Sequence, residues 1–459
     1  MSLPRVACAL LLTALASSQF VDGCYTSIFA FGDSLSDTGN YISLTSDGLL
    51  QYDGIPSCSV PPYGETFFHH PTGRCSDGRL IIDFIAEHFG LPLLPPYSGG
   101  ERANLGGGVN FAVVGAPALR DGANGSYSRE NISMITQINR FKTLLPSICK
   151  NSSCEDIFGR ALIVFGPFGG DDYASAILSK MVEEAHLLQP LVINAVASAI
   201  EELIELGAVN IMVTGMMPDG CIGVSLTVYY GSNDEDYDPN TGCLIWLNKF
   251  AQNHNELLQI ELTRIQERHP NTFITHADYY NAGLELFLSP EKYGFNNESL
   301  NACCGSGGPY NVDDNAKCGH PSSHACDDPS SYIQWDGAHL TQAAYEWIAK
   351  ELLSDVDRSD RPSTHYPSSS IPSPNPVTTS SPELPSFQSR KAGIQCYLLA
   401  VLEPDPNLTV IPKRRYITCT FHYPHQRVLG ANTATSNTRL PSPADVPLPA
   451  PARRHHSQD

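Results

Sequence analysis

The chain has 459 residues, with 28 Lys and Arg against 48 Asp and Glu, which gives a formal net charge of −20 at pH 7. Hydrophobic residues make up 42% and charged residues 17%, which is enough apolar material for a sizeable core and too little charge for a disordered acidic chain. An acidic chain without a Lys/Arg-rich helix lacks the clustered cations that phosphate binding needs, so we expect no nucleic-acid partner.

The N-terminus has the layout of a secretory signal peptide, which we place at residues 1–16. Arg5 precedes the apolar run Val6–Ala16, and this run ends in small residues, as signal peptides do before their cleavage site. The run is too short to span a bilayer, and no later segment offers about 18 consecutive apolar residues, so we expect no transmembrane segment. We therefore predict a secreted, extracellular protein.

The cysteines and the candidate N-glycosylation sites are consistent with a secreted protein. Of the 14 cysteines, Cys8 leaves with the signal peptide, and the rest enter an oxidising route in which disulfides are the expected fate. The Asn-X-Ser/Thr pattern marks candidate N-glycosylation sites. These candidates are Asn124, Asn131, Asn151 and Asn297.

The body of the chain, residues 19–360, alternates short apolar runs with helical patterns and is expected to form one domain. We expect strands over Ile28–Phe31, Val109–Val114, Ala161–Phe165, Val209–Thr214 and Thr272–Thr275. We expect helices over Leu80–Phe89, Leu191–Leu206 and Leu247–His269. Nearly all-apolar strands are typical of a parallel sheet covered on both faces, and the alternation with helices predicts an α/β sandwich. Ligands of such sheets bind beyond the carboxyl ends of the strands.

The composition changes sharply near Arg361. Residues 361–459 hold 16 of the 35 prolines and carry ten basic against five acidic residues. A Pro/Ser-rich segment of this kind cannot bury enough apolar surface to offset its chain entropy, so we predict a largely disordered tail. Only Ile394–Leu402 is apolar enough to become ordered. Two explanations stay open: an extension that contacts anionic cell-surface polymer, and an error in the gene prediction.

A serine follows the first expected strand directly, in the sequence Gly32-Asp33-Ser34-Leu35. Such a position, flanked by glycine and small polar residues, suits an exposed nucleophile on a tight turn. The same residues also suit an ordinary polar turn with Ser34 as the N-cap of a helix.

Near the end of the body, Asp336 precedes His339 by three residues, and the helical pattern Gln342–Leu353 follows. On a turn that enters a helix, this carboxylate can fold back and accept a hydrogen bond from the imidazole. That bond fixes the tautomer and leaves the other ring nitrogen available as a base. Taken alone, the pair also fits a satisfied surface turn.

Together, Gly-Asp-Ser-Leu and Asp-x-x-His resemble the GDSL esterase/lipase family of SGNH-hydrolase type, whereas the G-x-S-x-G elbow of α/β-hydrolases is absent. Further motifs similar to the plant branch of the family occur in the same order, over about Ser27–Leu353. They are Pro61-Pro62-Tyr63-Gly64, Thr72-Gly73-Arg74, Ser76-Asp77-Gly78-Arg79, Gly108-Val109-Asn110-Phe111-Ala112 and Tyr332-Ile333-Gln334-Trp335-Asp336-Gly337.

The resemblance implies a flavodoxin-like three-layer αβα sandwich and hydrolysis of small-molecule or lipid acyl esters through an acyl-enzyme. It implies that Ser34 is the nucleophile and that Asp336 and His339 complete the triad. It also implies an oxyanion hole formed by the Ser34 backbone N–H, the Gly115 N–H and an asparagine amide. No metal or organic cofactor is implied. An acyltransferase of the same chemistry is an alternative, if an alcohol outcompetes water.

One position departs from the family pattern. The Gly-Gly-Asn-Asp-Tyr segment reads Gly169-Gly170-Asp171-Asp172-Tyr173 here, so Asp171 replaces the amide donor. Losing one oxyanion donor typically lowers the rate by about 10²–10³, but a protonated carboxyl can donate a hydrogen bond. We hypothesise either weak activity favoured at acidic pH or near-complete inactivity, which would leave a binding protein on a hydrolase scaffold. Alternatively, Asp171 points away and caps the next helix.

The body contains 11 cysteines, so at least one lacks a partner within it. Cys149 with Cys154, and Cys221 with Cys243, are plausible local pairs. A cluster before Asp336 has the residue types of a zinc site, but it lacks regular C-x-x-C spacing, and we favour disulfides. Bridges there would fix the loop that precedes Asp336. The cluster comprises Cys303, Cys304, Cys318, His320, His324 and Cys326.

Overall fold

The computed structural model describes residues 25–46, 57–97, 107–119, 131–150, 152–359, 394–397 and 418–421. It comprises two compact units, Met1–Tyr366 and Pro367–Asp459, and each is described by itself. The predicted signal peptide, Asn124, Asn151 and most of the predicted tail lie outside the described residues.

The first unit is built on a parallel sheet of five strands in the order β2-β1-β3-β4-β5, which is the flavodoxin-like order. The strands are β1 (Ser27–Phe31), β2 (Gly108–Asn110), β3 (Ala161–Phe165), β4 (Asn210–Thr214) and β5 (Phe273–Ala277). Every residue of β1, β2 and β3 is buried. The predicted parallel sheet is therefore confirmed, with β1 between β2 and β3.

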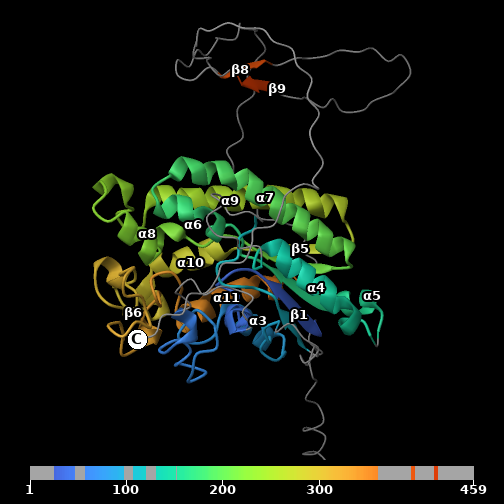
Figure 1. The fold of residues 1–459 in the computed structure, drawn as a ribbon, viewed down its shortest axis with the longest axis horizontal. Helices are drawn as coiled ribbons and strands as arrows, with labels where there is room; N and C mark the ends of the chain where they lie inside the picture. Colours follow the sequence, from blue (N-terminus) through green and yellow to red (C-terminus); the bar gives the residue numbers. More distant parts are fainter. Residues whose placement is uncertain are drawn as a thin grey trace, which may run out of the picture. The chain divides into compact units, whose positions relative to one another are not determined.

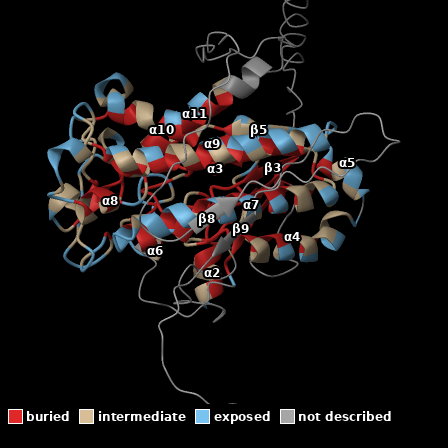
Figure 2. Cartoon of the chain, turned by 90° about the horizontal axis from the view of Figure 1, so that it is seen from above, coloured by how far each residue is buried: buried red, intermediate tan, exposed pale blue. Residues whose placement is uncertain are grey.

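Helices cover both faces of the sheet, as Figure 1 shows, with α7 and α9 on one side and α3 and α11 on the other. Alternate residues of β1 face the two layers: Phe29 and Phe31 pack on one side, and Ile28 and Ala30 on the other. The inward faces of the helices are buried and their outward faces exposed (Figure 2). The predicted three-layer α/β sandwich is thus confirmed.

The elements around the sheet have the following bounds. The helices are α2 (Asn40–Ser46), α3 (Ile81–His88), α4 (Met134–Ile148), α5 (Cys154–Phe158), α6 (Gly170–Leu178), α7 (Val182–Glu205), α8 (Gly223–Val228), α9 (Ile245–Arg268), α10 (Tyr279–Leu288) and α11 (Gln342–Ser359). The short 3₁₀ turns are η1 (Ser57–Ser59), η3 (Asp219–Cys221), η4 (Asp234–Asp236), η5 (Pro290–Tyr293), η6 (Pro309–Asn311) and η7 (Pro329–Ser331). The strands β6 (Cys304–Gly305) and β7 (His324–Ala325) form a separate antiparallel pair.

Strand β2 and helix α7 are among the elements that differ from their predicted bounds. The second strand ends at Asn110 instead of Val114, because the Asn110 side chain accepts a hydrogen bond from the Ala112 N–H at 2.8 Å and turns the chain. Helix α7 begins nine residues before Leu191 and runs through Pro190. A hydrogen bond holds its first half against α9: the buried Gln189 amide donates to the Phe250 carbonyl at 2.9 Å.

Among the described residues, α7 is also the one helix whose length and composition would suffice to cross a membrane. Its Val192, Val196 and Ile200 lie in the core between the sheet and α9. A core helix of a globular domain has the same apolar character. The absence of a transmembrane segment therefore stays a prediction.

Five disulfides join cysteines among the described residues of the first unit. The predicted pairs Cys149–Cys154 and Cys221–Cys243 are confirmed. The cysteine cluster before Asp336 forms Cys303–Cys326 and Cys304–Cys318, which confirms disulfides over zinc ligation there. Cys58–Cys75 is a further pair that the sequence did not suggest. The eleventh cysteine of the body, Cys24, lies outside the described residues.

The second unit contains one antiparallel pair, β8 (Ile394–Tyr397) and β9 (Thr418–Phe421). Strand β8 falls within the only stretch of the tail that we expected to order, Ile394–Leu402. Its partner β9 was not expected. The prediction that the rest of the tail is disordered concerns residues outside the described ones.

A buried ion pair joins α3 to the segment that follows β1. The Arg74 guanidinium binds Asp83 through two hydrogen bonds of 2.8 Å, and the two side chains are only 7% and 0% exposed. Arg74 also donates to the Thr38 carbonyl at 3.3 Å, while Asp83 accepts from the Leu80 N–H at 2.9 Å. One ion pair thus fixes both the start of α3 and the loop after the first strand.

Replacing Asp83 should cost substantial stability, because it leaves the Arg74 charge buried without its partner. We expect Asp83→Asn to lower the free energy of unfolding by about 3 kcal/mol or more, as measured by urea denaturation. Glu87→Gln is the control, since it breaks the more exposed Arg79–Glu87 pair and should cost less than about 1 kcal/mol. Equal losses in the two variants would contradict this account of the buried pair.

Candidate active site

Ser34 lies on a tight turn at the carboxyl end of β1, an inner strand of the sheet. The Asp33 carbonyl closes this turn by accepting hydrogen bonds from the N–H groups of Ser36 at 3.2 Å and Asp37 at 3.0 Å. The next helix, α2, begins only at Asn40. The Asp37 carboxylate caps that helix, accepting from the Asn40 N–H at 2.6 Å. Ser34 is therefore not a helix N-cap, and the alternative interpretation of this segment was wrong.

Buried polar side chains hold the turn in place. Gln137 of α4 binds both backbone groups of Gly32, accepting from its N–H at 3.0 Å and donating to its carbonyl at 2.8 Å. A side chain at Gly32 would place its Cβ 2.4 Å from the Gly166 carbonyl oxygen. The Asn110 amide donates to the Ser36 carbonyl at 2.6 Å. Sequence reasoning missed Gln137, because its distance along the chain gives no sign of this contact.

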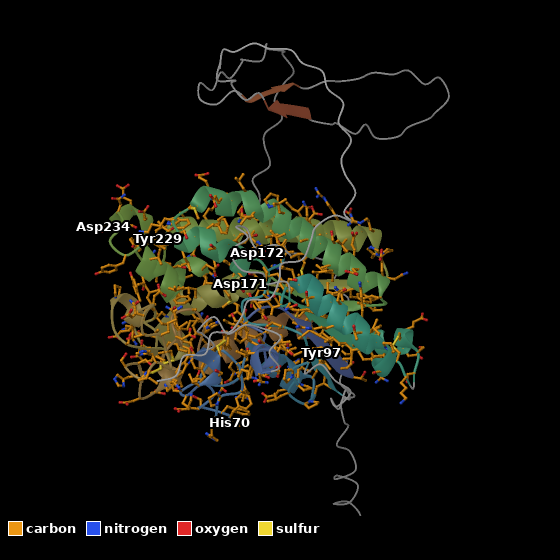
Figure 3. The ribbon with its side chains drawn as sticks, viewed as in Figure 1. His70, Tyr97, Asp171, Asp172, Tyr229 and Asp234 are labelled. Atoms are coloured by element: carbon orange, nitrogen blue, oxygen red, sulfur yellow. A yellow bond between two sulfur atoms is a disulfide. The ribbon has the colours of Figure 1, made fainter. Side chains whose placement is uncertain are left out.

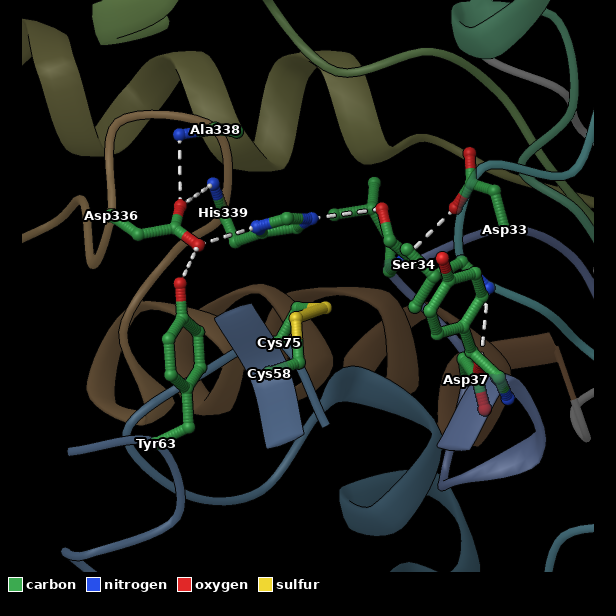
Figure 4. The surroundings of a disulfide bond; sticks show 12 residues. Asp33, Ser34, Asp37, Cys58, Tyr63, Cys75, Asp336, Ala338 and His339 are labelled. Atoms are coloured by element: carbon green, nitrogen blue, oxygen red, sulfur yellow. Dashed lines mark hydrogen bonds and ion pairs between the residues drawn. A yellow bond between two sulfur atoms is a disulfide. The ribbon is translucent and has the colours of Figure 1, made fainter. Parts of the chain in front are cut away.

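The structure brings Ser34, Asp336 and His339 together in one array, drawn in Figure 4. The His339 Nε2 lies 2.9 Å from the Ser34 Oγ, although the two residues are 305 positions apart. The His339 Nδ1 lies 2.8 Å from the Asp336 Oδ2. The Asp336 Oδ1 accepts from the N–H groups of Ala338 at 2.9 Å and His339 at 2.8 Å. This arrangement can pass a proton from the serine hydroxyl to the imidazole.

A tyrosine completes the surroundings of Asp336. The Tyr63 hydroxyl donates to the Asp336 Oδ2 at 2.6 Å, and the Tyr63 side chain is fully buried, with its ring edge-on to Trp335 at 5.8 Å between centroids. Figure 4 shows Tyr63 below Asp336, near the Cys58–Cys75 disulfide. The sequence placed Tyr63 in a motif but gave no sign of this role.

The local electrostatics favour an ionised Asp336 beside a basic His339. Burial alone would raise the pKa of Asp336, but the His339 charge and the hydrogen bonds from His339, Tyr63 and Ala338 lower it below its ordinary value. Burial alone would lower the pKa of His339, but the charges of Asp336 and Asp171 raise it above 6.5. The side chains are 6% and 14% exposed, so solvent screens the pair only weakly.

A cavity of 320 Å³ opens above Ser34 and His339, and Gly115 and Asp171 also line it. Gly115 has a φ of 77°, in the left-handed region that favours glycine. Asp37 holds this segment by accepting from the Val114 N–H at 2.9 Å. Asp171 stands in the first turn of α6 (Figure 3), on the cavity wall. The remaining walls are mainly apolar and include Ile177, Leu178, Met217, Ile222 and Leu247.

Two further features lie away from this cavity. A larger hollow of 830 Å³ lies beside the edge strand β5, between α10 and α11, and contains none of the predicted site residues. The candidate glycosylation sites Asn131 and Asn297 are both exposed. Among the described residues, no group of three or more His, Cys, Asp or Glu could hold a metal ion.

Comparison with known proteins decides the family. The family of GDSL-like lipases/acylhydrolases matches residues 28–352. The chain belongs to this family. A GDSL esterase/lipase from Arabidopsis thaliana is 50% identical over 336 residues, which cover 72% of this chain and 85% of that protein. Another Arabidopsis GDSL esterase/lipase is 46% identical over 349 residues, 75% and 88% of the two chains. A sinapine esterase from Brassica napus is 44% identical over 349 residues, 74% and 88%.

The cavity of this GDSL protein is rich in carboxyl groups. Asp33 and Asp219 line it together with Asp171, and none of the described residues that line it is Lys or Arg. Burial and the Asp171 charge raise the pKa of Asp219 to about 7. Burial likewise raises the pKa of the neighbouring Asp172 to about 7, although Asp172 accepts from the N–H groups of Ala118 and Leu119. Several site carboxyls therefore bind protons near neutral pH.

The free energy of unfolding of this GDSL protein should fall as the pH rises from about 6.5 to 8. At the start of this window the folded state still holds protons on Asp172 and Asp219, whereas the corresponding carboxyls of the unfolded chain have already lost theirs. Each such group lowers stability by up to about 1.4 kcal/mol per pH unit. Burial lowers the pKa of His254 to about 4, so its opposing contribution acts mainly below this window.

Urea denaturation at pH 6.5, 7.25 and 8 measures this slope. Asp219→Asn should make the slope shallower, because it removes one of the groups that release a proton on the folded side only. Asp234→Asn, at an exposed position in η4 (Figure 3), is the control and should leave the slope unchanged. A stability that rises from pH 6.5 to 8 would contradict the account.

Proposed function

We propose that the chain is a secreted carboxylic ester hydrolase in which Ser34 is the nucleophile, His339 the general base and acid, and Asp336 the group that orients His339. Family membership supports the hydrolysis of acyl esters. The observation that carries the residue assignment is the 2.9 Å contact between the Ser34 Oγ and the His339 Nε2. The 2.8 Å contact between His339 and a buried, ionised Asp336 supports it further.

The reaction proceeds in two halves. His339 Nε2 takes the proton of the Ser34 hydroxyl as the Oγ attacks the ester carbonyl carbon, and a tetrahedral oxyanion forms. The alcohol then leaves with the proton that His339 returns to its oxygen, and an acyl-Ser34 remains. Water, deprotonated by His339, attacks this acyl group, and the acid is released as Ser34 regains its proton. Asp336 stays ionised and stabilises the imidazolium throughout.

The oxyanion hole comprises the backbone N–H groups of Ser34 and Gly115 and the carboxyl of Asp171. All three residues line the same cavity, which supports Asp171 facing the reacting atoms. A protonated Asp171 donates one hydrogen bond to the oxyanion, whereas an ionised Asp171 repels it. Protonation of Asp171 therefore favours activity at acidic pH, but the raised pKa of His339 means that the base is also protonated as the pH falls, so the activity is weak.

The proposal also includes the removal of a signal peptide and an extracellular location. Residues 1–16 form a signal peptide, residues 19–360 the hydrolase domain, and residues 361–459 an extension outside the catalytic fold. Five disulfides support folding in an oxidising, extracellular route. The exposed positions of Asn131 and Asn297 are compatible with N-glycosylation there.

The role of Asp171 is tested by Asp171→Asn on a short-chain aryl ester between pH 4.5 and 8.5. We expect the asparagine variant to hydrolyse the ester about 10²-fold faster than the parent at pH 8, because the amide restores a permanent donor, and to gain less at pH 5. Ser34→Ala is the blank and should show no turnover above the solution rate. A fully active parent at neutral pH that gains nothing from asparagine would remove Asp171 from the oxyanion hole.

A second candidate, favoured by the carboxyl at position 171, is a binding protein that has kept the scaffold of a hydrolase. A fluorophosphonate probe separates the two, because it labels only an activated serine. We expect a single label on Ser34, identified by peptide mass mapping, and none in His339→Ala. A folded protein that stays unlabelled would favour the binding protein. In a labelled protein, an acyl ester offered with an acceptor alcohol distinguishes hydrolysis from acyl transfer by the product formed.

A further inference from the structure

A second cavity, of 190 Å³, adjoins the cavity over Ser34. Four residues line both cavities, namely Val114, Val224, Ala338 and His339. The first cavity contains Ser34, Gly115 and Asp171, and the second contains none of these three. The second cavity instead extends from His339 past Asp336 and Tyr63 to the loop closed by the Cys304–Cys318 disulfide. His339 therefore stands at the boundary between two separate spaces.

The chemistry assigns different halves of an ester to these spaces. In the proposed function, the carbonyl carbon stands at the Ser34 Oγ and its oxygen points to donors in the first cavity. His339 must later give a proton to the departing alcohol oxygen, so the alcohol has to lie against the imidazole. The acyl chain then occupies the first cavity, whose other walls are largely apolar. Once the acyl chain fills the first cavity, the space left for the alcohol beside His339 is the second cavity.

We propose that this second cavity binds the alcohol portion of the substrate; the inference rests on the proposed function and specifies its substrate class. Its volume of 190 Å³ is below the roughly 300–1,000 Å³ of pockets that bury drug-sized ligands, which suits a compact alcohol and not a long alkyl chain. Polar residues contribute to its outer wall, namely Asn311, Asp313, Asp314 and Lys317. The preferred alcohol is therefore small and carries further hydrogen-bonding groups.

The outer wall of this alcohol cavity is preformed. It belongs to the loop between Cys304 and Cys318, which the disulfide closes. The Asn311 side chain holds this loop by accepting from the Gly307 N–H at 2.9 Å and donating to the Ala302 carbonyl at 2.8 Å. Val312 packs against the triad turn so closely that a Cβ at Gly337 would lie 2.3 Å from the Val312 Cγ2. The cavity thus keeps its shape without a substrate.

Two matched variants test the assignment, because each cavity has an alanine in its wall that the other lacks: Ala316 in the alcohol cavity and Ala174 in the first. Ala316→Leu and Ala174→Leu add the same three carbons to different spaces. Release of acid is followed in a pH-stat with two ester series. One series varies the alcohol of a butyrate from methanol through glycerol to phenol, and the other varies the acyl group of a methyl ester from acetate to octanoate.

We expect Ala316→Leu to lower kcat/KM for glyceryl and phenyl butyrate about tenfold relative to methyl butyrate, and to leave the octanoate-to-acetate ratio unchanged. Ala174→Leu should do the reverse. If Ala316→Leu changes the acyl series, or if both variants change the same series, the inference is overturned. A parent that hydrolyses no ester and stays unlabelled at Ser34 would instead overturn the proposed function. Circular dichroism checks folding, and Ala316→Val replaces the leucine variant if that variant does not fold.

Discussion

The contact between Ser34 and His339 depends on a parallel sheet that brings two distant chain segments to one edge. Ser34 follows β1, an inner strand of that sheet whose carboxyl end points to that edge. The Asp336–His339 turn arrives there from the other end of the domain and is fixed by main-chain hydrogen bonds. The Cys303 N–H donates to the Gln334 carbonyl at 2.9 Å, and the Cys304 N–H donates to the Trp335 carbonyl at 2.7 Å. The disulfide-bonded loop therefore positions the turn that carries Asp336 and His339.

Buried polar groups carry much of this positioning. Asp37 accepts hydrogen bonds from four backbone N–H groups, those of Gly39, Asn40, Tyr41 and Val114. It thereby connects the Ser34 turn to the cavity wall at Gly115. Burial raises the pKa of Asp37 to about 6, although these bonds lower it. Tyr63 plays the corresponding part for Asp336. Satisfied networks of this kind fix one conformation, whereas a single missing partner would leave a buried polar group unpaired.

The layered fold could be predicted from the sequence because each strand of the sheet carries its own local signal. The apolar runs at Ile28–Phe31 and Ala161–Phe165 match β1 and β3 to within one residue. The candidate triad came from two short motifs and a family resemblance, and the structure places those residues within hydrogen-bonding distance. Gln137 and Tyr63 could not be assigned in this way. Their contacts join chain positions 105 and 273 residues apart, and no local pattern encodes such a pairing.

Ser34 and His339 are far apart in the chain, so they are synthesised at different times. The serine turn leaves the ribosome early, together with the first strand, but the histidine turn emerges only after all five strands of the sheet have been made. Until then Ser34 is an ordinary hydroxyl with no base beside it. A growing chain can therefore begin to fold around its sheet before the residue proposed as the base has been made, and under the proposed function it gains the capacity to attack an ester only when translation of the domain is nearly complete.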